Sequence, residues 1–519
     1  MVTFVKHTTI LFTFMLMSVL ANADFRLPEG NYISAKMPMH VVYPRPDSET
    51  QPHARHRWAH PSMQYRIPIG IQGGAWPFKY ELVDAPEGAV IGSLYGSGDY
   101  GEITWQPQQG GVYSFTVKVT DQDLNTVTAS WKVTVDASQF VFIQDGWQGS
   151  KVGTINQPLE DIADWYRNSP SDNTYHNKIV VLRGGSYQLL GGPSTNNNVR
   201  LEETTKTPSI IGFPGELPVV DSSQSKMING NSGLKDTFIA DIRWENSRQD
   251  VANAHFHWAT GDVTRGTWWN NTFYNHGAGL AGDDNTAAVF ISSTDTHKKN
   301  ILYKNNVHDK FTPHGGNSGY VDIYYSSYVL IEGNVAKNST TGYGFWAKGT
   351  TSFVTVRANK AHDNVAGGGI TVGYGAESPE LVHDHEVCWN HIALLPGNDT
   401  QQTLQWATST AYRDKSYNSY IYRNSFVNGS STVRFKGSEN YHVDGNVVVT
   451  DWQARWGTDN MTTTVPNIVG READGITDVN GNLAGSYRKG YIGKAGHEVS
   501  SIDRGIMPPE DIVTAVPAQ

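Results

Sequence analysis

Cysteine is almost missing from this chain, since Cys388 is the single one among 519 residues. A lone cysteine forms no intramolecular disulfide and no cysteine-based metal cluster. Charged residues are also few, at 17% of the sequence. The fold must therefore be stabilised by buried apolar area and backbone pairing.

Positive charge is in deficit as well. Lysine and arginine number 40 against 50 aspartates and glutamates, and the formal net charge is −10 at pH 7. A protein that binds nucleic acid needs a basic surface that displaces counterions from phosphates. We therefore expect no nucleic-acid partner. An acidic polysaccharide is a different case, because it needs only a local cluster of cations.

Long hydrophobic runs are limited to the N-terminus. Residues 10–20 are apolar, follow Lys6 and His7, and precede the small residues Ala21 and Ala23. This order is typical of a secretory signal with its cleavage site, and the run is too short to span a bilayer comfortably. A retained membrane anchor is the alternative. We predict a signal peptide at residues 1–23, a secreted or periplasmic location, no membrane contact after cleavage, and a monomer.

The sequence is rich in glycine, with 52 residues, and has 11% aromatic residues. Glycine adopts the backbone conformations that tight turns require, which favours an all-β protein. Phe115, Val117 and Val119 alternate with polar neighbours, as in a half-buried strand. Residues 24–137 resemble the immunoglobulin-like or cadherin-like β-sandwich modules of secreted enzymes. We expect this module to be a spacer or packing module, not a sugar-binding one, and to be dispensable for chemistry.

The residue pattern of the sequence changes from Phe140 onward. Residues 158–166 predict a short helix, and a strand ending in Arg183, two glycines and Ser186 follows. This order resembles the opening of pectate-lyase-like right-handed β-helices. There a helix covers the open end of the stack and protects its edge from unwanted pairing.

A repeat dominates the following residues. Seven segments show apolar alternation, then an asparagine, then a second short alternation. The asparagines are Asn271, Asn306, Asn334, Asn359, Asn390, Asn424 and Asn446. Repeats of this size, with length differences absorbed by loops, are typical of a parallel β-solenoid. We predict a right-handed parallel β-helix at residues 138–470, asparagine amides stacked inside it, and a closing segment at residues 471–519.

A second strand lies upstream of each asparagine. We aligned these strands on one apolar residue expected to point inward: Phe256, Phe290, Ile323, Phe345, Ile370, Trp406 and Phe435. Because side chains alternate along a strand, the residues beside these should point outward together. The predicted outward residues are His255, His257, Asp322, Tyr324, Trp346, Lys348, Thr371, Arg434 and Lys436. Such a strip combines aromatic rings that stack on sugars with cations that bind carboxylate or sulfate.

The stretch from Asn317 to Gly349 is similar to the active-site coils of pectate-lyase-like enzymes, and closest to family 9 of the polysaccharide lyases. The resemblance implies that Lys348 is the catalytic base and that Asp322 matches the last aspartate of a calcium site. The family has adjacent acidic residues before the glycine, whereas here Ser318 runs directly into Gly319. We expect Ca²⁺, if used at all, to bind at Asp322, and calcium dependence to be weak or absent.

The sequence thus favours a lyase that cleaves an acidic, uronate-containing polysaccharide by β-elimination. Such an enzyme neutralises the uronate carboxylate, removes the C5 proton and protonates the departing oxygen. Lys348 would be the base, Tyr324 or His257 the proton donor, and Arg434 the carboxylate-neutralising cation. The predicted substrate contacts are His255, Trp346, Lys436 and His314.

Two alternatives remain at this point. One is a glycoside hydrolase on the same fold, because residues 433–437 resemble the Arg-x-Lys motif of family 28 polygalacturonases. Those enzymes need several carboxylates placed for acid and base work, and the Asp283–Asp284 pair precedes the Asn-Ser stretch instead of following it. The other is a non-catalytic carbohydrate-binding β-helix, since a fold alone proves no activity.

Overall fold

The structure is a computed structural model of the chain. It describes residues 32–92, 101–168, 175, 177–190, 199–201, 209–229, 234–247, 255–277, 286–293, 298–312, 318–339, 344–364, 369–374, 382–394, 404–407, 416–427, 433–436, 438–449, 461–462 and 468–470. The predicted signal peptide and the predicted closing segment lie outside these residues. Among the described residues, no helix is long and apolar enough to cross a membrane.

The first part of the described chain is a small β-sandwich. One sheet has the order β2-β9-β8-β5, a second has the order β3-β7-β6, and β1 pairs with β4. The strands are β1 (His40–Tyr43), β2 (Trp58–Ala59), β3 (Tyr65–Pro68), β4 (Gly70–Gln72), β5 (Lys79–Asp84), β6 (Val90–Ile91), β7 (Glu102–Trp105), β8 (Gly111–Thr120) and β9 (Thr126–Val135), with short 3-10 turns η1 (Arg55–Arg57) and η2 (Ala137–Gln139). Phe115, Val117 and Val119 are buried as predicted. Phe115 stacks on Trp131 at 5.4 Å between ring centroids.

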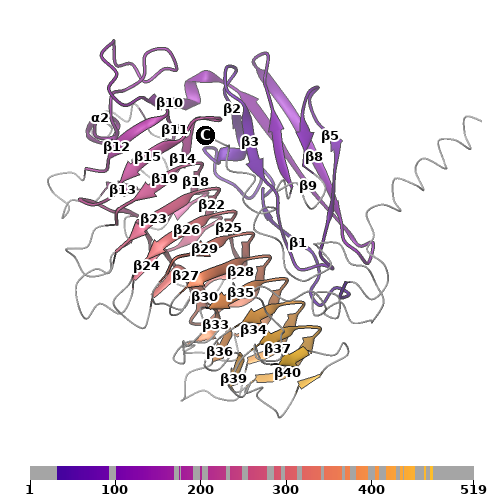
Figure 1. Ribbon diagram of the computed structural model, residues 1–519. Coiled ribbons are helices and arrows are strands. Elements are labelled where there is room, and N and C mark those ends of the chain that lie inside the picture. Colours follow the sequence, from indigo (N-terminus) through magenta and orange to yellow (C-terminus); the bar gives the residue numbers. More distant parts are fainter. Residues whose placement is uncertain are drawn as a thin grey trace, which may run out of the picture.

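The rest of the described chain is a parallel β-helix, which confirms the predicted fold class (Figure 1). The chain coils through three parallel sheets of twelve, eleven and nine described strands, and nine coils contribute one strand to each sheet. Sheet I contains β10 (Phe140–Ile143), β11 (Ile179–Leu182), β14 (Ser209–Gly212), β18 (Phe238–Ala240), β22 (Thr267–Trp269), β25 (Lys298–Lys304), β28 (Ser327–Glu332), β31 (Ser352–Arg357), β34 (His383–Cys388), β37 (Ser416–Tyr422), β40 (Ser438–Asp444) and β42 (Met461–Thr462).

Sheets II and III complete the triangular coil. Sheet II contains β12 (Gly185–Gln188), β15 (Pro218–Asp221), β19 (Arg243–Glu245), β23 (Thr272–His276), β26 (Val307–Phe311), β29 (Val335–Lys337), β32 (Lys360–Asn364), β35 (His391–Leu394), β38 (Ser425–Val427), β41 (Val447–Val449) and β43 (Ile468–Gly470). Sheet III contains β13 (Val199–Leu201), β16 (Met227–Asn229), β20 (His257–Ala259), β24 (Thr286–Ser292), β27 (Ser318–Tyr324), β30 (Gly344–Lys348), β33 (Ile370–Tyr374), β36 (Leu404–Ala407) and β39 (Val433–Lys436). A minor two-stranded sheet pairs β17 (Leu234–Lys235) with β21 (Val263–Thr264).

The predicted helix is present as α2 (Ile162–Asn168), a few residues later than expected. Ile162 and Trp165 are buried in the same apolar cluster as the first coils. The helix therefore adds apolar side chains to the end of the stack.

The seven repeated asparagines form one continuous ladder at the turn between sheets I and II. Each side-chain amide donates to the Oδ1 of the asparagine in the next coil, over distances of 2.9–3.1 Å from Asn271 to Asn446. The same Oδ1 also accepts the backbone N–H of the preceding asparagine, as Asn359 does from Asn334 at 3.0 Å. All seven side chains are buried. The ladder pairs polar groups that would otherwise be unsatisfied inside the coil.

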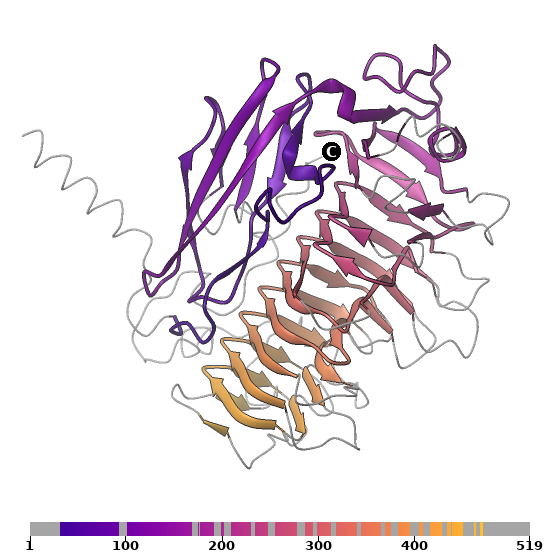
Figure 2. The same cartoon turned by 180° about the vertical axis from the view of Figure 1, so that it is seen from behind.

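The β-sandwich packs lengthwise against sheet I (Figures 1 and 2). Tyr43 contacts Phe238 of β18 at 5.6 Å between ring centroids. Trp76 contacts Trp389, which follows β34 and lies five strands further along sheet I, at 5.0 Å. One buried apolar cluster contains residues of both parts. Of the two roles expected for this module, the structure shows packing, because the sandwich covers the outer face of sheet I.

Buried charges also join the two parts. Lys304, Glu332 and Arg357 occupy adjacent strands of sheet I, with Lys304 Nζ 2.8 Å from Glu332 Oε1 and Arg357 Nε 2.8 Å from Glu332 Oε2. Burial alone would raise the pKa of Glu332, but Lys304 and Arg357 together hold it below its ordinary value. Lys304 donates to the Ile69 carbonyl at 3.0 Å, and Arg357 donates to the Ile71 carbonyl at 2.6 Å. Backbone carbonyls of the sandwich thus satisfy cations of the β-helix.

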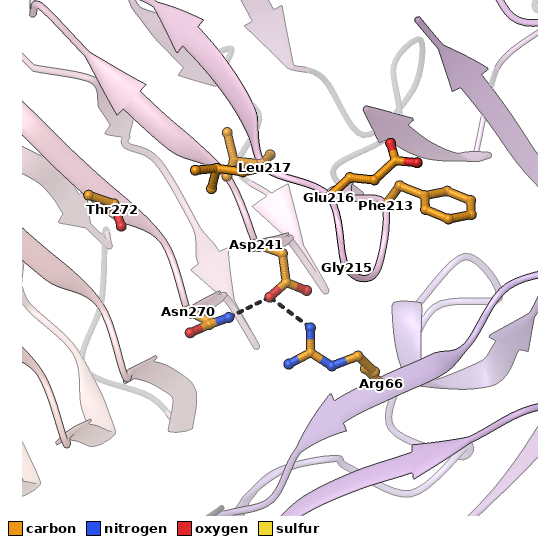
Figure 3. Close-up of a pocket in the computed structure, with 9 residues that line it drawn as sticks. Arg66, Phe213, Gly215, Glu216, Leu217, Asp241, Asn270 and Thr272 are labelled. Atoms are coloured by element: carbon orange, nitrogen blue, oxygen red, sulfur yellow. Dashed lines mark hydrogen bonds and ion pairs between the residues drawn. The ribbon is translucent and has the colours of Figure 1, made fainter. Parts of the chain in front are cut away.

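A pocket lies at the boundary between the sandwich and the β-helix, beside the turn that follows β18 (Figure 3). Arg66 of β3 reaches Asp241 of the β-helix at 3.2 Å, and Asn270 donates to the same carboxylate at 2.6 Å. The polar groups that converge there are thus paired with one another across the domain boundary. We interpret this pocket as part of the interface.

We predict that Asn359→Ala lowers the free energy of unfolding by about 2–4 kcal/mol, because it leaves the Asn334 backbone N–H and the Ile331 carbonyl buried without their present partner. Equilibrium unfolding in denaturant measures the change. Asn156→Ala, in an exposed turn, is the matched control and should stay within about 0.5 kcal/mol of wild type. Equal effects at the two positions would contradict a structural role for the ladder.

We also predict that deletion of residues 24–136 prevents the β-helix from folding into a soluble monomer, because the deletion exposes the apolar outer face of sheet I and removes the carbonyl partners of Lys304 and Arg357. Size-exclusion chromatography and binding of a hydrophobic dye measure the outcome. A monomeric truncated chain with the melting temperature of the full chain would refute the interface described above.

Candidate functional site

The outer face of sheet III carries the side chains predicted to act on a ligand. Backbone register places Trp258, Phe290, Asp322, Trp346 and Thr371 in one outward column across five successive strands. Their neighbours in the strands point into the coil, where Val321, Phe345 and Ile370 are fully buried. A second outward position pairs Tyr324 with Lys348. Asp322, Tyr324, Trp346 and Lys348 are thus brought together as predicted, but Asp322 and Trp346 are fully buried, and only Tyr324 and Lys348 of the four are partly exposed.

Phe290 was predicted to point inward, and this is wrong. It pairs with Asp322 and lies partly exposed on the outer face, while Val289 and Ile291 on either side of it are fully buried. The strand reads Ala-Val-Phe-Ile, so apolar residues occupy both faces and alternation does not reveal which face is inside.

His257 was predicted as an outward proton donor, and this orientation is also wrong. Its side chain is 2% exposed, accepts a hydrogen bond from Trp268 Nε1 at 3.1 Å, and lies 4.3 Å from the Trp244 ring. Burial lowers its pKa to about 3. Phe256, the residue aligned as inward, precedes the first residue of β20, so the side chains of both residues enter the coil. His257 therefore belongs to the core.

His255 is buried as well, and is therefore not an open substrate contact. Its Nδ1 lies 2.7 Å from the Ala287 carbonyl, and its ring lies 5.4 Å from that of Phe290. Burial, and secondarily the charge of Lys226, lower its pKa to about 3. The ring packs beside the outward aromatics Trp258 and Phe290.

Lys348 lies against two aromatic rings. Its Nζ is 4.3 Å from the centroid of Trp346 and 5.1 Å from the centroid of Tyr324. Burial lowers the pKa of Lys348, and the negative charge of Asp322 opposes this shift. The surroundings thus favour the neutral amine, which is the form that accepts a proton.

Asp322 is fully buried, and neither carboxylate oxygen has a hydrogen-bond partner among the described residues. Burial raises the pKa of Asp322 well above its ordinary value, and the charge of Lys348 offsets only part of the effect. Gly319 leaves the room that this carboxylate needs, because a Cβ there would lie 2.4 Å from Asp322 Oδ1. An unpartnered buried carboxyl is costly to fold, and such groups are concentrated at functional sites.

Asp322 is the one acidic residue within the nine strands of sheet III that the structure describes, whereas Arg200, Lys348, Arg434 and Lys436 are basic. A sheet with this balance suits an anionic ligand even though the whole chain is acidic. The net charge of the chain therefore does not describe this face.

Arg434 and Lys436 lie further along the sheet, in the order that the strand alignment predicted. Their strand, β39, is three strands beyond β30, which is about 14 Å at the usual strand spacing. Backbone pairing puts Arg434 in register with Gln405, in the same column as Trp346. His314 lies outside the described residues.

The metal prediction finds no support in the described ranges. There, no group of three or more His, Cys, Asp or Glu side chains comes together as a metal site. Asp322 alone does not supply the six to eight oxygen ligands that calcium takes. These residues by themselves do not fit a calcium ion, and we derive no chemical step through one.

Three residues of this face were missed at the sequence level. Trp258 and Phe290 are partly exposed aromatics of the outer column, and Lys226 Nζ lies 4.4 Å from the Trp258 ring centroid. The alternation of this strand could have identified Trp258 as an outward residue. The alignment took Phe256 as inward and His257 as outward, which assigned Trp258 to the inner face. Lys226 immediately precedes β16 and has no periodic signature.

The chain matches no known protein-family model, and a search of curated proteins finds no relative by sequence. Among solved structures it is similar to a family 28 exopolygalacturonase of Yersinia enterocolitica, with 10% identity over 87% of this chain and 100% of that chain and a TM-score of 0.39. Two putative α-galactosidases of Bacteroides fragilis match at 9% identity. They cover 44% and 42% of this chain and 59% and 46% of theirs, with TM-scores of 0.18 and 0.17. Similarities this weak assign no activity to the chain.

We predict that Asp322→Asn stabilises the protein at pH 8 relative to wild type, and does so less at pH 4. The unfolded carboxyl ionises near pH 3.9, while the folded pKa is higher. Between these values the folded state binds more protons than the unfolded state, so wild-type stability falls as the pH rises. The amide of the variant does not ionise and escapes this loss.

Melting temperatures of both chains at the two pH values measure the effect. Asp309→Asn, at a partly exposed carboxylate of sheet II, controls for removal of a charge. A difference between Asp322→Asn and wild type that stays constant from pH 4 to pH 8 would contradict the assignment of a neutral buried carboxyl.

Proposed function

We propose that the protein is an exported polysaccharide lyase that cleaves an acidic, uronate-containing polysaccharide by β-elimination at the outer face of sheet III. The observation that carries the proposal is the Lys348 amine. It rests on Trp346 and Tyr324, and burial lowers its pKa, while a negative charge on nearby Asp322 opposes that shift.

In this mechanism the neutral Lys348 amine removes the C5 proton of a uronate. The electron pair of the C5–H bond forms a C4–C5 double bond, and the C4–oxygen bond breaks. The Tyr324 hydroxyl, on the strand beside Lys348, donates a proton to the departing oxygen. The products are a new chain end and an unsaturated uronate.

Asp322 has a different role from the one expected from the sequence. With its pKa raised by burial, the carboxyl is protonated and donates a hydrogen bond. A donor of this kind, aimed at the substrate carboxylate, stabilises the negative charge that grows there as C5 loses its proton. Arg434 and Lys436 are then assigned to the carboxylates of more distant sugar units. The proposal requires no calcium step.

A glycoside hydrolase is the second candidate. A raised carboxyl pKa is the property of a general acid, so Asp322 suits that role too. Hydrolysis by the common mechanisms uses two carboxyl groups, about 5–5.5 Å apart for retention or about 6.5–9.5 Å apart for inversion. The described strands of sheet III supply only one carboxyl group, that of Asp322. Polygalacturonate, the acidic chain for which the similar exopolygalacturonase is named, belongs to a substrate class that both candidates accommodate.

We predict that Lys348→Ala lowers kcat by about 100-fold or more, the usual contribution of a general base. Lys348→Arg should be equally impaired, because a guanidinium stays protonated at working pH. Lys337→Ala, at a partly exposed lysine of sheet II paired with Asp309 at 3.6 Å, is the matched control and should retain wild-type kcat.

The measurement follows ultraviolet absorbance and reducing ends together on pectate, alginate, glucuronan, glycosaminoglycans and sulfated algal galactans. Both signals rise for a lyase, and reducing ends alone rise for a hydrolase. A folded Lys348→Ala chain that keeps more than about a tenth of wild-type kcat would exclude the base role. Failure to cleave any substrate of the panel would favour a non-catalytic binding protein.

A further inference from the structure

The outer column of sheet III continues beyond Lys348 as a row of aromatic rings. Tyr324 lies 5.0 Å from Phe290 between ring centroids, and Phe290 lies 6.5 Å from Trp258. Lys348 Nζ covers the Trp346 ring at one end of the row, and Lys226 Nζ covers the Trp258 ring at the other. The row is therefore continuous across β20, β24, β27 and β30, with a cation at each end.

We propose that this row is an extended binding site for an acidic oligosaccharide that lies along the axis of the β-helix. Trp258 and Phe290 would stack on its sugar rings, and Lys226 would contact an anionic group at the far end. The orientation of the chain relative to the reacting unit rests on the proposed function at Lys348. The binding site itself does not depend on which bond is cleaved.

The dimensions of the row suit a polysaccharide. From β16, which Lys226 precedes, to β30 there are four strand spacings, or about 19 Å at about 4.8 Å each. A pyranose unit advances an extended chain by a distance comparable to one strand spacing. Each rung of the row can therefore face about one sugar unit, so that about four to five units span the row at that spacing.

The chemistry of the row favours an acidic chain. Aromatic rings offer flat apolar faces to the C–H faces of sugars, and cations bind carboxylate or sulfate groups between them. Asp322 is the one acidic residue in the sheet III strands from β16 to β30, and burial raises the pKa of its carboxyl well above the ordinary value. These strands therefore offer at most one carboxylate that could repel an anionic substrate.

The three middle aromatics of the row differ from ordinary core packing. Trp258, Phe290 and Tyr324 are partly exposed, whereas the inward residues beside Phe290 and Tyr324 are fully buried. At the two ends of the row, the Trp346 ring is fully buried and Lys226 is 6% exposed. The outer face of sheet I is apolar for another reason, since the β-sandwich covers it. The aromatic row lies on a different sheet from that cover.

The test measures binding separately from cleavage. Trp258→Ala, Phe290→Leu and Lys226→Gln are each made in the full chain carrying Lys348→Ala, so that no probe is consumed. Titration calorimetry with polygalacturonate and alginate oligosaccharides of two to eight units gives the dissociation constant for each length. Phe290→Leu keeps an apolar side chain that preserves folding but removes the flat ring.

The matched control is Tyr274→Ala. Tyr274 is a partly exposed aromatic of sheet II that also carries cations over its ring, with Arg243 at 4.6 Å and Lys310 at 5.8 Å from its centroid. Tyr274 is thus also an aromatic ring covered by cations, but it lies on another sheet. Removal of its ring should leave oligosaccharide binding unchanged. Circular dichroism and melting temperatures confirm that each variant is folded.

We expect affinity to rise with length up to about five units and then level off. Trp258→Ala and Phe290→Leu should each weaken binding of the longer oligosaccharides about tenfold, and leave dimers unaffected. Lys226→Gln should weaken binding and make it less sensitive to salt. An unchanged dependence on length in both aromatic variants, or absence of any binding by the parent chain, would overturn the inference. Length-dependent binding without an unsaturated product from the chain that retains Lys348 would overturn the lyase proposal alone.

Discussion

The asparagine ladder is the constraint on which the rest of this structure depends. Each coil from Asn271 to Asn446 places an amide at the same point, and these amides bond one another from coil to coil. Because strand side chains alternate with a period of two, this fixed point sets the register of the strands of sheets I and II that flank it. Sheet III, which carries Asp322, Trp346 and Lys348, is stacked on the same coils.

The candidate site departs from the charge pairing of the rest of the fold. Buried Glu332 is matched by ion pairs with Lys304 and Arg357. Asp322 has the charge of Lys348 nearby but no hydrogen-bond partner among the described residues, and Gly319 leaves room for its carboxylate. Burial of a carboxyl beside a shielded amine drives both toward their neutral forms, which is a destabilised arrangement for the resting protein. Arrangements of this kind persist where chemistry needs an acid and a base side by side.

Much of the fold and part of the site could be predicted from the sequence. Asn271 to Asn446 were recognised because a buried amide ladder leaves a repeated polar residue in an apolar pattern. Asp322, Tyr324, Trp346 and Lys348 were placed correctly because polar and aromatic residues alternate with small or apolar ones there. Phe290 was misplaced because its strand is apolar on both faces. His257 was misplaced because two neighbouring residues, Phe256 and His257, both enter the coil. The packing of the β-sandwich on sheet I joins residues far apart in the chain and leaves no local pattern.

The contact between Arg357 and the backbone carbonyls of Ile71 and Gly73 has a consequence for the order of assembly. The ribosome completes the β-sandwich before it makes sheet I, and domains generally fold as units in that order. Each new coil then meets a finished surface that already offers acceptors for its buried cations. A sandwich that folds first would thus present the coils of sheet I with a preformed surface on which to pack.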